Sequence, residues 1–268
     1  MTSAADRTAL FHSLHQHGPL ALPNAWDVAS ALIVEAAGAK AVATTSAGVA
    51  WSLGAPDGDA LDRDLAIDLV ARIARAVKIP VTADIESGFG ENAEQVGDTA
   101  RAVTEAGASG VNIEDGHGSG LRDVKEQQER LAAAREAAPD LYINARTDVF
   151  LRGVGEPGER LHLALERAQA YLEAGASGIF VPGVTDLATV GELAKAIDAP
   201  LNVLAGPGAP AVHELGTAGA ARISVGTALA SAAYAVARKA AEELLTKGTY
   251  DSTSEGLGYG ELNALFGN

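Results

Sequence analysis

One short pattern recurs along this sequence: a helix-like run ends in Ala-Gly-Ala and passes directly into a branched, apolar run. The pattern is centred on Gly38, Gly107, Gly175 and Gly219. Glycine at such a point fits the left-handed cap that ends many helices, and the run after it is typical of a buried strand. Gly107 lies 69 positions after Gly38, and Gly175 lies 68 after Gly107, so each period has room for two strand–helix units.

Other apolar runs alternate with these, which gives eight expected strands. They lie at 20–23, 41–45, 80–83, 111–114, 141–145, 179–182, 200–204 and 222–226. Helices with apolar stripes are expected at 62–77, 93–106, 124–137, 158–174, 187–197 and 227–245. Eight alternating units of about 30 residues predict a (β/α)8 TIM barrel of the α/β class. A doubly wound sheet is the alternative, but the regularity of the units favours closure of the sheet.

The chain shows no segment with the character of an interdomain linker. We therefore expect residues 1–268 to form a single (β/α)8 barrel domain, in which 227–268 supply the final helix and a C-terminal tail helix. A tail helix beyond a complete barrel needs a surface to pack on, and a neighbouring subunit is one candidate. A homo-oligomer, either a dimer or a tetramer, is the expectation.

The protein is strongly acidic, with a net charge of −15 and a pI near 4.7. This argues against nucleic acids and anionic membranes as partners, although a local arginine or a metal ion can still attract an anionic substrate. The absence of cysteine excludes disulfides, thiolate catalysis and cysteine-bound metals. No apolar run approaches the roughly 20 residues of a membrane-spanning helix, and no signal peptide is evident, so a cytoplasmic location is expected.

Residues 81–90 are the segment that points most directly to chemistry. The strand ends with Asp84 and Glu86, whose side chains lie on the same side of an extended backbone, and Gly88 and Gly90 then allow a tight loop. In a barrel, the functional site forms at the carboxyl ends of the strands. Two carboxylates followed by a glycine loop at that end suit the binding of a metal ion.

Several other expected strand ends carry residues that would reach the same rim. The candidates are Trp26, Ser46, Ala47, Gly48, Asp57, Asn112, Glu114, Asp115, Asn144, Arg146, Asp148, Asn202 and Ser224. Clustered carboxylates repel one another unless a cation compensates their charge, and an all-oxygen ligand set without cysteine or paired histidine favours Mg²⁺ or Mn²⁺. Arg146 would then bind an anionic group of the substrate.

Each of these residues also has a purely structural explanation. Asp57 lies in a Pro-Asp-Gly turn, where aspartate is common for backbone reasons. Glu114 and Asp115 could cap the turn that follows them, and Arg146 could pair with Asp148 or with Glu114. The joint pattern at the strand ends, rather than any single member, favours a functional site.

The sequence resembles the isocitrate lyase/phosphoenolpyruvate mutase superfamily over nearly its whole length, as a methylisocitrate lyase-like member. The matching motifs are Pro23-Asn24-Ala25-Trp26-Asp27, Thr45-Ser46-Ala47-Gly48, Asp84-Ile85-Glu86-Ser87-Gly88-Phe89-Gly90, Asn112-Ile113-Glu114-Asp115, Ala145-Arg146-Thr147-Asp148 and Glu261-Leu262-Asn263. The resemblance implies a barrel whose last helix is exchanged between subunits. It also implies Mg²⁺ held directly by Asp84 and, through water, by Asp57, Glu86 and Glu114.

The resemblance further implies how a small anionic carboxylate substrate would bind. Its carboxylate and oxo oxygens would meet the metal and the backbone N–H groups near Ser46, Ala47 and Gly48, with Arg146 on the far anionic group. Trp26 and Asn202, at other strand ends, are added as candidate substrate contacts. The family chemistry is formation of a Mg²⁺-stabilised pyruvate-type enolate as a C–C or P–C bond breaks, with proton transfer by a lid residue.

The lid is where the sequence departs from the family pattern. The isocitrate and methylisocitrate lyases carry a Lys-Lys/Arg-Cys-Gly-His motif whose cysteine is the acid/base, and this chain has no cysteine. Residues 116–123 read Gly-His-Gly-Ser-Gly-Leu-Arg-Asp, which also lacks the lysine and asparagine of the mutase lid. His117 is the candidate replacement, because imidazole exchanges protons near neutral pH; otherwise it is simply an exposed loop residue.

These observations favour a Mg²⁺-dependent carbon–carbon lyase that acts on a small 2-oxo or 2-hydroxy di- or tricarboxylate, with Arg146, Glu114 and His117 as its catalytic residues. A phosphonopyruvate or oxaloacetate hydrolase, or a phosphoenolpyruvate mutase-type enzyme, is the alternative within the family. Two alternatives belong to other classes. One is a phosphate–sugar enzyme that uses 202–208 and 224–226, and the other is a non-catalytic barrel that binds a dicarboxylate.

Overall fold

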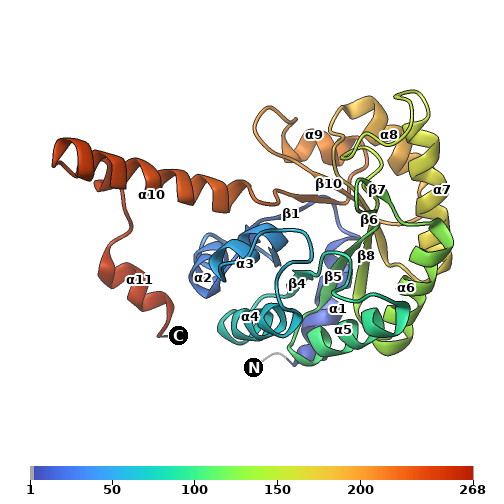
Figure 1. Cartoon of the computed structure of the whole chain (residues 1–268), viewed down its shortest axis with the longest axis horizontal. Helices are drawn as coiled ribbons and strands as arrows, with labels where there is room; N and C mark the ends of the chain where they lie inside the picture. Colours follow the sequence, from blue (N-terminus) through green and yellow to red (C-terminus); the bar gives the residue numbers. More distant parts are fainter. Residues whose placement is uncertain (1–2, 268) are drawn as a thin grey trace.

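One parallel sheet closes on itself at the centre of the computed structural model, which describes residues 3–267 (Figure 1). Its strand order is β1-β11-β10-β9-β8-β5-β4-β3-β2. The edge strands β1 (Leu20–Leu22) and β2 (Asn24–Ala25) are two pieces of one segment, separated only by Pro23. Proline has no N–H to donate to the sheet, but the Pro23 carbonyl accepts from the Ala43 N–H at 3.1 Å. The nine strands therefore form the expected eight-stranded barrel.

The remaining strands match the predicted positions to within two residues. They are β3 (Val42–Thr44), β4 (Val81–Asp84), β5 (Gly110–Glu114), β8 (Tyr142–Arg146), β9 (Gly178–Val181), β10 (Leu201–Leu204) and β11 (Arg222–Ser224). A two-stranded hairpin, β6 (Gly116–His117) with β7 (Gly120–Leu121), lies outside the barrel sheet and was not predicted.

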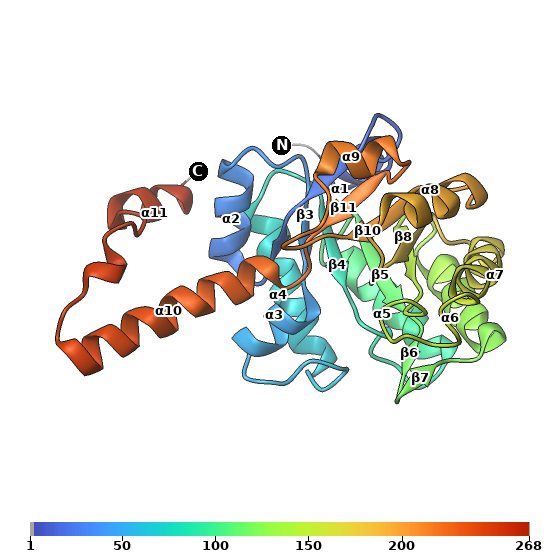
Figure 2. The same ribbon diagram turned by 90° about the horizontal axis from the view of Figure 1, so that it is seen from above.

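Helices surround the barrel as an outer layer (Figure 2). They are α2 (Val28–Ala36), α4 (Arg63–Ala76), α5 (Ala93–Glu105), α6 (Val124–Ala137), α7 (Arg160–Glu173), α8 (Leu187–Ala196) and α9 (Val212–Thr217), with the short α3 (Ser46–Ser52) after β3. Side-chain oxygens of Asp62, Asn92 and Asp123 accept from the first free N–H groups of α4, α5 and α6. Gly107 and Gly175 adopt φ of 98°, as the recurring Ala-Gly-Ala pattern predicts.

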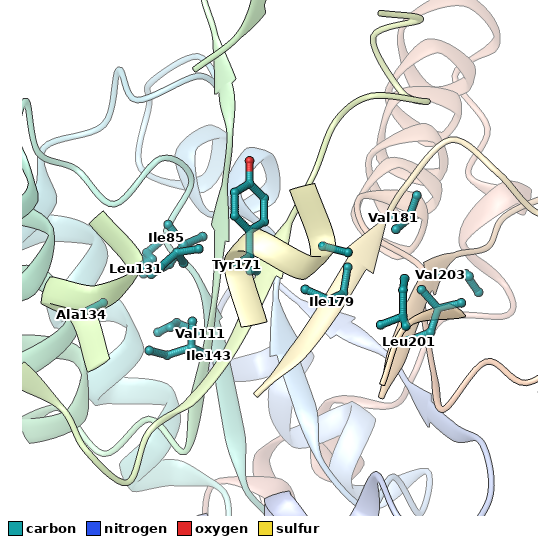
Figure 3. Packing of buried hydrophobic residues seen from close by; sticks show 14 of the residues in the cluster. Ile85, Val111, Leu131, Ala134, Ile143, Tyr171, Ile179, Val181, Leu201 and Val203 are labelled. Atoms are coloured by element: carbon teal, nitrogen blue, oxygen red, sulfur yellow. The ribbon is translucent and has the colours of Figure 1, made fainter. Parts of the chain in front are cut away.

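The core lies between the strands and the helices and consists mainly of branched aliphatic residues and alanine. In Figure 3, Val111 and Ile143 of neighbouring strands pack against Leu131 and Ala134 of α6. Alanine on the helices lets them lie close to the sheet, and β-branched residues fill the pleated strands. None of the helices within residues 3–267 combines the length and apolar character that a membrane crossing requires.

The helix α1 (Ala4–Leu14) was not predicted, and it packs beside the barrel strand β8. Ser3 and Asp6 form a reciprocal capping box that starts this helix, which was the available sequence signal. Phe11 is completely buried, and its ring lies edge-on to Tyr142 at 5.3 Å. His15 follows the helix and stacks on Tyr142 at 4.1 Å, so α1 holds an imidazole in the protein interior.

The long helix α10 (Ala228–Lys247) leaves the barrel instead of lying against it (Figures 1 and 2). Ala230, in its first turn, is its one buried residue. Tyr234 lies beside Trp26 and Trp51, with ring centroids 6.1 and 6.2 Å away. After the 3-10 turn η1 (Asp251–Thr253), α11 (Tyr259–Leu265) lies next to α2. The last helix of the barrel thus forms at the expected place in the chain but does not cover the chain's own barrel.

An apolar groove of about 870 Å³ lies on the outside of the barrel, over β1 and β11. Leu20, Leu22 and Ile223 of these strands line it, together with Leu14 of α1 and Ile33 of α2. In a (β/α)8 barrel, the outer ring of helices normally covers every strand. The groove is therefore the strand surface that α10 would cover if it packed against the barrel.

We expect His15 to make the fold sensitive to acid. Its Nδ1 bonds to the Phe11 carbonyl at 2.8 Å, and burial lowers its pKa to about 3. The unfolded chain binds this proton below about pH 6.5, whereas the folded chain does not until about pH 3, so the contribution of His15 to stability falls by about 1.4 kcal/mol per pH unit across that window. The buried carboxylates of the rim titrate in the same range, so the test is the difference between two proteins: His15→Gln should gain about 2 kcal/mol of urea-unfolding free energy relative to the wild type as the pH is lowered from 7.5 to 5.

His17 provides the control, because its side chain is exposed one turn from the buried cluster. His17→Gln should keep the wild-type slope. A stability difference between His15→Gln and the wild type that stays constant from pH 7.5 to 5 would contradict this account.

Candidate active site

The carboxyl ends of the parallel strands meet around a small cavity of about 160 Å³. It is lined by Asn24, Thr45, Ser46, Ala47, Asp57, Asp84, Asn112, Arg146, Phe180, Leu204, Ser224, Gly226 and Thr227. The structure thus brings together seven of the residues chosen from the sequence, which are Ser46, Ala47, Asp57, Asp84, Asn112, Arg146 and Ser224. Larger cavities exist elsewhere on the molecule, but none of them contains this set of charged groups.

Asp84 is the last residue of β4, and its carboxylate lines the cavity. Its Oδ1 accepts from the Glu86 N–H at 3.3 Å, and its Oδ2 accepts from the Ser46 N–H at 3.5 Å. Burial raises the pKa of Asp84, and the neighbouring Asp57 raises it further, while Arg146 lowers it. The protein alone therefore supplies too little positive charge to balance the ionised carboxylate of Asp84.

Glu86 lies beyond the end of β4 with a left-handed φ of 52°, so the expected extended backbone from Asp84 to Glu86 is wrong, and its carboxylate joins two segments of the rim. Its Oε2 accepts from the Gly58 N–H at 3.0 Å and also from the Asp59 N–H. Burial raises the pKa of Glu86 to about 7, partly offset by the Asp59 N–H. Glu86, Asp59 and Phe89 all have positive φ, between 49° and 57°, although none is glycine. Such backbone strain persists where the surrounding structure holds it, and it often marks a functional site.

A buried arginine holds the strained loop in place. Arg130 of α6 is 1% exposed, and its Nη2 donates to the carbonyls of Ser87 and Gly90, at 2.8 Å each. Among residues 3–267 it has no carboxylate partner in its hydrogen bonds, so its role is to fix the backbone that follows Asp84. Sequence reasoning did not identify Arg130, because a single arginine on a helix carries no motif.

Arg146, at the end of β8, lies against two carboxylates. Its guanidinium makes a bidentate pair with Asp148 at 2.6 and 3.0 Å, and its Nη1 lies 2.6 Å from Glu114. Burial raises the pKa of Glu114 to about 8, although Arg146 opposes the shift. A guanidinium has five N–H donors, so these contacts leave two N–H groups for a ligand. The structural pairing considered for Arg146 is present, and it does not exclude substrate binding.

Asp115 is completely buried and supports this arrangement from behind. Its carboxylate accepts from the Asp148 N–H at 2.9 Å, the Tyr171 hydroxyl at 2.7 Å and Arg167 at 3.1 Å. Its own N–H donates to the Arg146 carbonyl at 3.1 Å. Asp115 therefore fixes the backbone that carries Arg146 and Asp148.

His117 lies on the β6–β7 hairpin, outside the cavity that contains Asp84. Its side chain is exposed and lines a separate cavity of about 750 Å³, beside Phe89 and Arg122. Arg152 donates to the Gly118 carbonyl at 2.9 Å and so ties the hairpin to the chain after β8. In this structure His117 and Asp84 do not share a cavity, so an acid/base role would require the hairpin to move.

The other candidate substrate contacts lie at the edge of the site or below it. Gly48 is packed so closely that a Cβ would come within 2.7 Å of Thr45 and 2.8 Å of Trp26. Trp26 contacts Tyr234 of α10 and does not line the cavity with Asp84. Asn202 is 1% exposed inside the barrel, where its Nδ2 donates to the Arg222 carbonyl and to Ser224 Oγ, both at 3.1 Å.

The carboxylates fit a hydrated divalent cation better than a directly chelated one. Nowhere in residues 3–267 do three histidine, aspartate or glutamate side chains lie close enough to share one ion directly. Asp84 faces the cavity with Asp57, and the pKa of each of Asp84, Glu86 and Glu114 is raised by burial, so the group lacks compensating positive charge. Mg²⁺ prefers oxygen ligands and usually keeps several waters, which suits one direct carboxylate with others around it.

The cavity also contains residues that sequence reasoning did not select as site residues. Asn24, Phe180, Leu204 and Thr227 line it, beside the predicted candidates Asn112 and Ser224. Asn24 closes the barrel: its Oδ1 accepts from the N–H groups of Val225 and Gly226, at 3.0 and 2.9 Å. The guanidinium carbon of Arg146 lies 5.7 Å from the centroid of the Phe180 ring. The available signal for Asn24 was a polar residue inside an otherwise apolar run.

Comparison with known proteins gives one family. The family model for phosphoenolpyruvate phosphomutase matches residues 11–245. The Mycobacterium tuberculosis (strain ATCC 25618 / H37Rv) protein Rv1998c, which is uncharacterized, is 37% identical over 233 residues, 86% of this chain and 87% of that protein. The 2-methylisocitrate lyase of Escherichia coli (strain K12) is 34% identical over 201 residues, and the match spans 70% of this chain and 66% of that enzyme.

A solved structure agrees over almost the whole length. A protein from Burkholderia cenocepacia J2315, assigned only provisionally as a lyase or mutase, superimposes with a TM-score of 0.91 at 36% identity, covering 99% of this chain and 97% of the other. The chain belongs to the phosphoenolpyruvate mutase/isocitrate lyase superfamily.

Proposed function

We propose that the protein is a Mg²⁺-dependent lyase that cleaves a C–C bond of a small 2-oxo or 2-hydroxy di- or tricarboxylate and releases a pyruvate-type product. The observation that carries this proposal is the small cavity that Asp84 and Arg146 share. The Asp84 carboxylate, whose charge the protein does not balance, can bind a cation there. The Arg146 guanidinium, which has free N–H groups, can bind a carboxylate of the substrate. Identity of 34% to a 2-methylisocitrate lyase supports the same reaction class.

In this proposal Asp84 binds Mg²⁺ directly, and Asp57, Glu86 and Glu114 hold its water ligands; Mn²⁺ could replace it. When bound, the ion would supply electrostatic stabilisation of negative charge that develops on a substrate oxygen. Ser46, Ala47 and Gly48 begin α3, so N–H groups of this turn have no partner within the helix and can donate to the substrate. The two remaining N–H groups of Arg146 bind the carboxylate at the end of the substrate that is away from the metal.

Proton transfer is assigned to Glu114 or His117. Glu114 lies beside Arg146, with its carboxylate 2.6 Å from Arg146 Nη1, and so stands next to the group proposed to bind the substrate. His117 would reach the substrate after movement of the β6–β7 hairpin. A phosphonopyruvate or oxaloacetate hydrolase, or a mutase, remains the second candidate, because the matching family model is that of a phosphomutase. A barrel that binds a dicarboxylate without catalysis is the third, because His117 lies outside the cavity.

The first test is Mg²⁺-dependent release of pyruvate, measured with coupled lactate dehydrogenase. Substrates would be oxaloacetate, phosphonopyruvate, methylisocitrate and dimethylmalate, with isocitrate followed by glyoxylate formation. Turnover should disappear with chelator and fall at least about 10³-fold in Asp84→Ala, because charge stabilisation is usually the largest catalytic term. His117→Gln should lose activity only if the hairpin supplies the acid/base.

Asp68→Ala is the matched control, since Asp68 is an exposed carboxylate paired with Arg72 on α4. It should keep wild-type turnover. Activity that survives in Asp84→Ala would overturn the metal-centred mechanism. Oxalate binding with Mg²⁺ but no turnover on any substrate would favour the non-catalytic barrel.

We also propose that the active form is a homo-oligomer in which α10 of each copy covers the apolar groove of another. Leu229, Val236 and Leu244 recur on one side of α10 and are exposed, at 40%, 59% and 56%. The groove over β1 and β11 is apolar and is not covered by the chain's own α10. Burial of two complementary apolar surfaces is the driving force expected for such an exchange.

Val236→Asp should convert the oligomer to a monomer in light scattering coupled to gel filtration, because it places a charge in the middle of the apolar side. Ser231→Asp adds the same charge to the opposite side of α10 and should leave the oligomer intact. A wild-type protein that is monomeric at micromolar concentration would contradict the exchange.

A further inference from the structure

Three asparagines form a hydrogen-bonded row across the interior of the barrel, below the cavity. Asn144 Nδ2 donates to Asn112 Oδ1 at 2.9 Å and to Asn202 Oδ1 at 3.0 Å. Asn112 and Asn144 are direct partners in the register of β5 and β8. Asn144 and Asn202 lie on either side of β9, where Gly178 is the register partner of Asn144. All three residues are at least 95% buried.

The orientation of each amide is fixed by its neighbours. Asn202 Nδ2 donates to the Arg222 carbonyl, which can only accept, so Asn202 Oδ1 must face Asn144. The two hydrogens of Asn144 Nδ2 are then used by Asn202 and Asn112. A second donor, Arg222 Nη2, reaches Asn112 Oδ1 at 3.1 Å. Rotating the Asn112 amide by 180° would set its NH₂ group against two donors, so its oxygen must point down into the barrel.

The Asn112 NH₂ group therefore points the other way. It has no hydrogen-bond partner in the described part of the chain, yet it is not among the side-chain atoms sealed from solvent without one, as Asn144 Oδ1 is. Asn112 lines the cavity, beside its register partner Asp84. Asn24 lines the same cavity, but both ends of its amide are already used, by Thr44 on one side and by Val225 and Gly226 on the other.

We propose that Asn112 is a substrate-binding residue that donates its amide N–H to an oxygen of the substrate. The inference rests on the proposed function, because it takes the cavity to hold a carboxylate or oxo group. A neutral donor on the cavity floor, close to the Asp84 carboxylate, recognises an acceptor oxygen without adding charge. Asn144 and Asn202 are positioning residues, since they act on the ligand only through the orientation of Asn112.

The test measures binding of two probes by calorimetry: Mg²⁺ alone, and oxalate in saturating Mg²⁺. Asn112→Asp keeps an acceptor for Asn144 and Arg222 but loses the donor. Asn112→Ser is neutral and too short to reach the ligand. Both should weaken oxalate binding at least about tenfold, the usual effect of losing one hydrogen bond to a charged group. Asn112→Ser should leave Mg²⁺ affinity within about threefold of wild type, and Asn144→Ala should weaken oxalate at least about threefold with the same Mg²⁺ affinity.

Asn92→Asp is the charge control, because Asn92 is an exposed helix cap that keeps its acceptor oxygen after the change. It should bind both probes as the wild type does. Unchanged oxalate affinity in Asn112→Ser, even with a loss in Asn112→Asp, would show that added charge rather than a lost donor is responsible, and would overturn the proposal. Unchanged oxalate affinity in Asn144→Ala would overturn the positioning role. A wild-type protein that binds Mg²⁺ but not oxalate would refute the proposed function itself, before any variant is compared.

Discussion

Mutual repulsion among carboxylates at one end of the barrel is the constraint on which the rest of the structure depends. Parallel strands bring their carboxyl ends together, and in this chain those ends carry Asp84, Glu86 and Glu114, with Asp57 on the adjoining turn. Burial raises the pKa of the first three. The protein compensates part of this charge with Arg146 and with backbone N–H groups from residues 58 and 59. A divalent cation with water ligands would compensate the rest.

The surrounding framework holds these charges in place against their repulsion. Arg130 fixes the loop after Asp84 through two backbone carbonyls, and Asp115 fixes the backbone around Asp148. Glu86 accepts from the Gly58 N–H, and this hydrogen bond holds the turn that contains Asp57 against the loop after β4. These supports come from helices and loops far apart in sequence, which is why residues with strained, positive φ persist in the loop. Below the cavity, hydrogen bonds among three asparagines and Arg222 likewise fix the orientation of the Asn112 amide.

Much of the fold could be predicted from the sequence, because the signals are local and repeated. Glycine caps such as Gly107 and the branched runs after them depend only on neighbouring residues, and the eight strands follow from them. The helix α1 was missed because it is weakly amphipathic and only its capping box signals it, and the β6–β7 hairpin could not be predicted because two-residue strands carry no pattern. The position of α10 could not be predicted either, because it depends on what covers an apolar groove rather than on helix propensity.

The residues of the candidate site also divide into those that the sequence could predict and those that it could not. Asp84 and Arg146 end strands with clear motifs, so their convergence followed from the barrel alone. Asn202 was expected at the end of a strand, but it is the second residue of β10, so its amide is committed inside the barrel, and Asn112 faces the cavity in its place. His117 lies beyond the cavity because the direction of a glycine-rich loop cannot be read from its sequence. Side-chain direction at the end of a strand depends on hydrogen bonds from neighbouring strands, which no single segment contains.

The most direct test of this account is a crystal structure of the protein soaked with Mn²⁺, in which anomalous scattering locates the ion. The account predicts one ion in the cavity, bound directly by the Asp84 carboxylate, with water ligands shared by Asp57, Glu86 and Glu114. An empty cavity at saturating Mn²⁺, or an ion bound without Asp84, would contradict it.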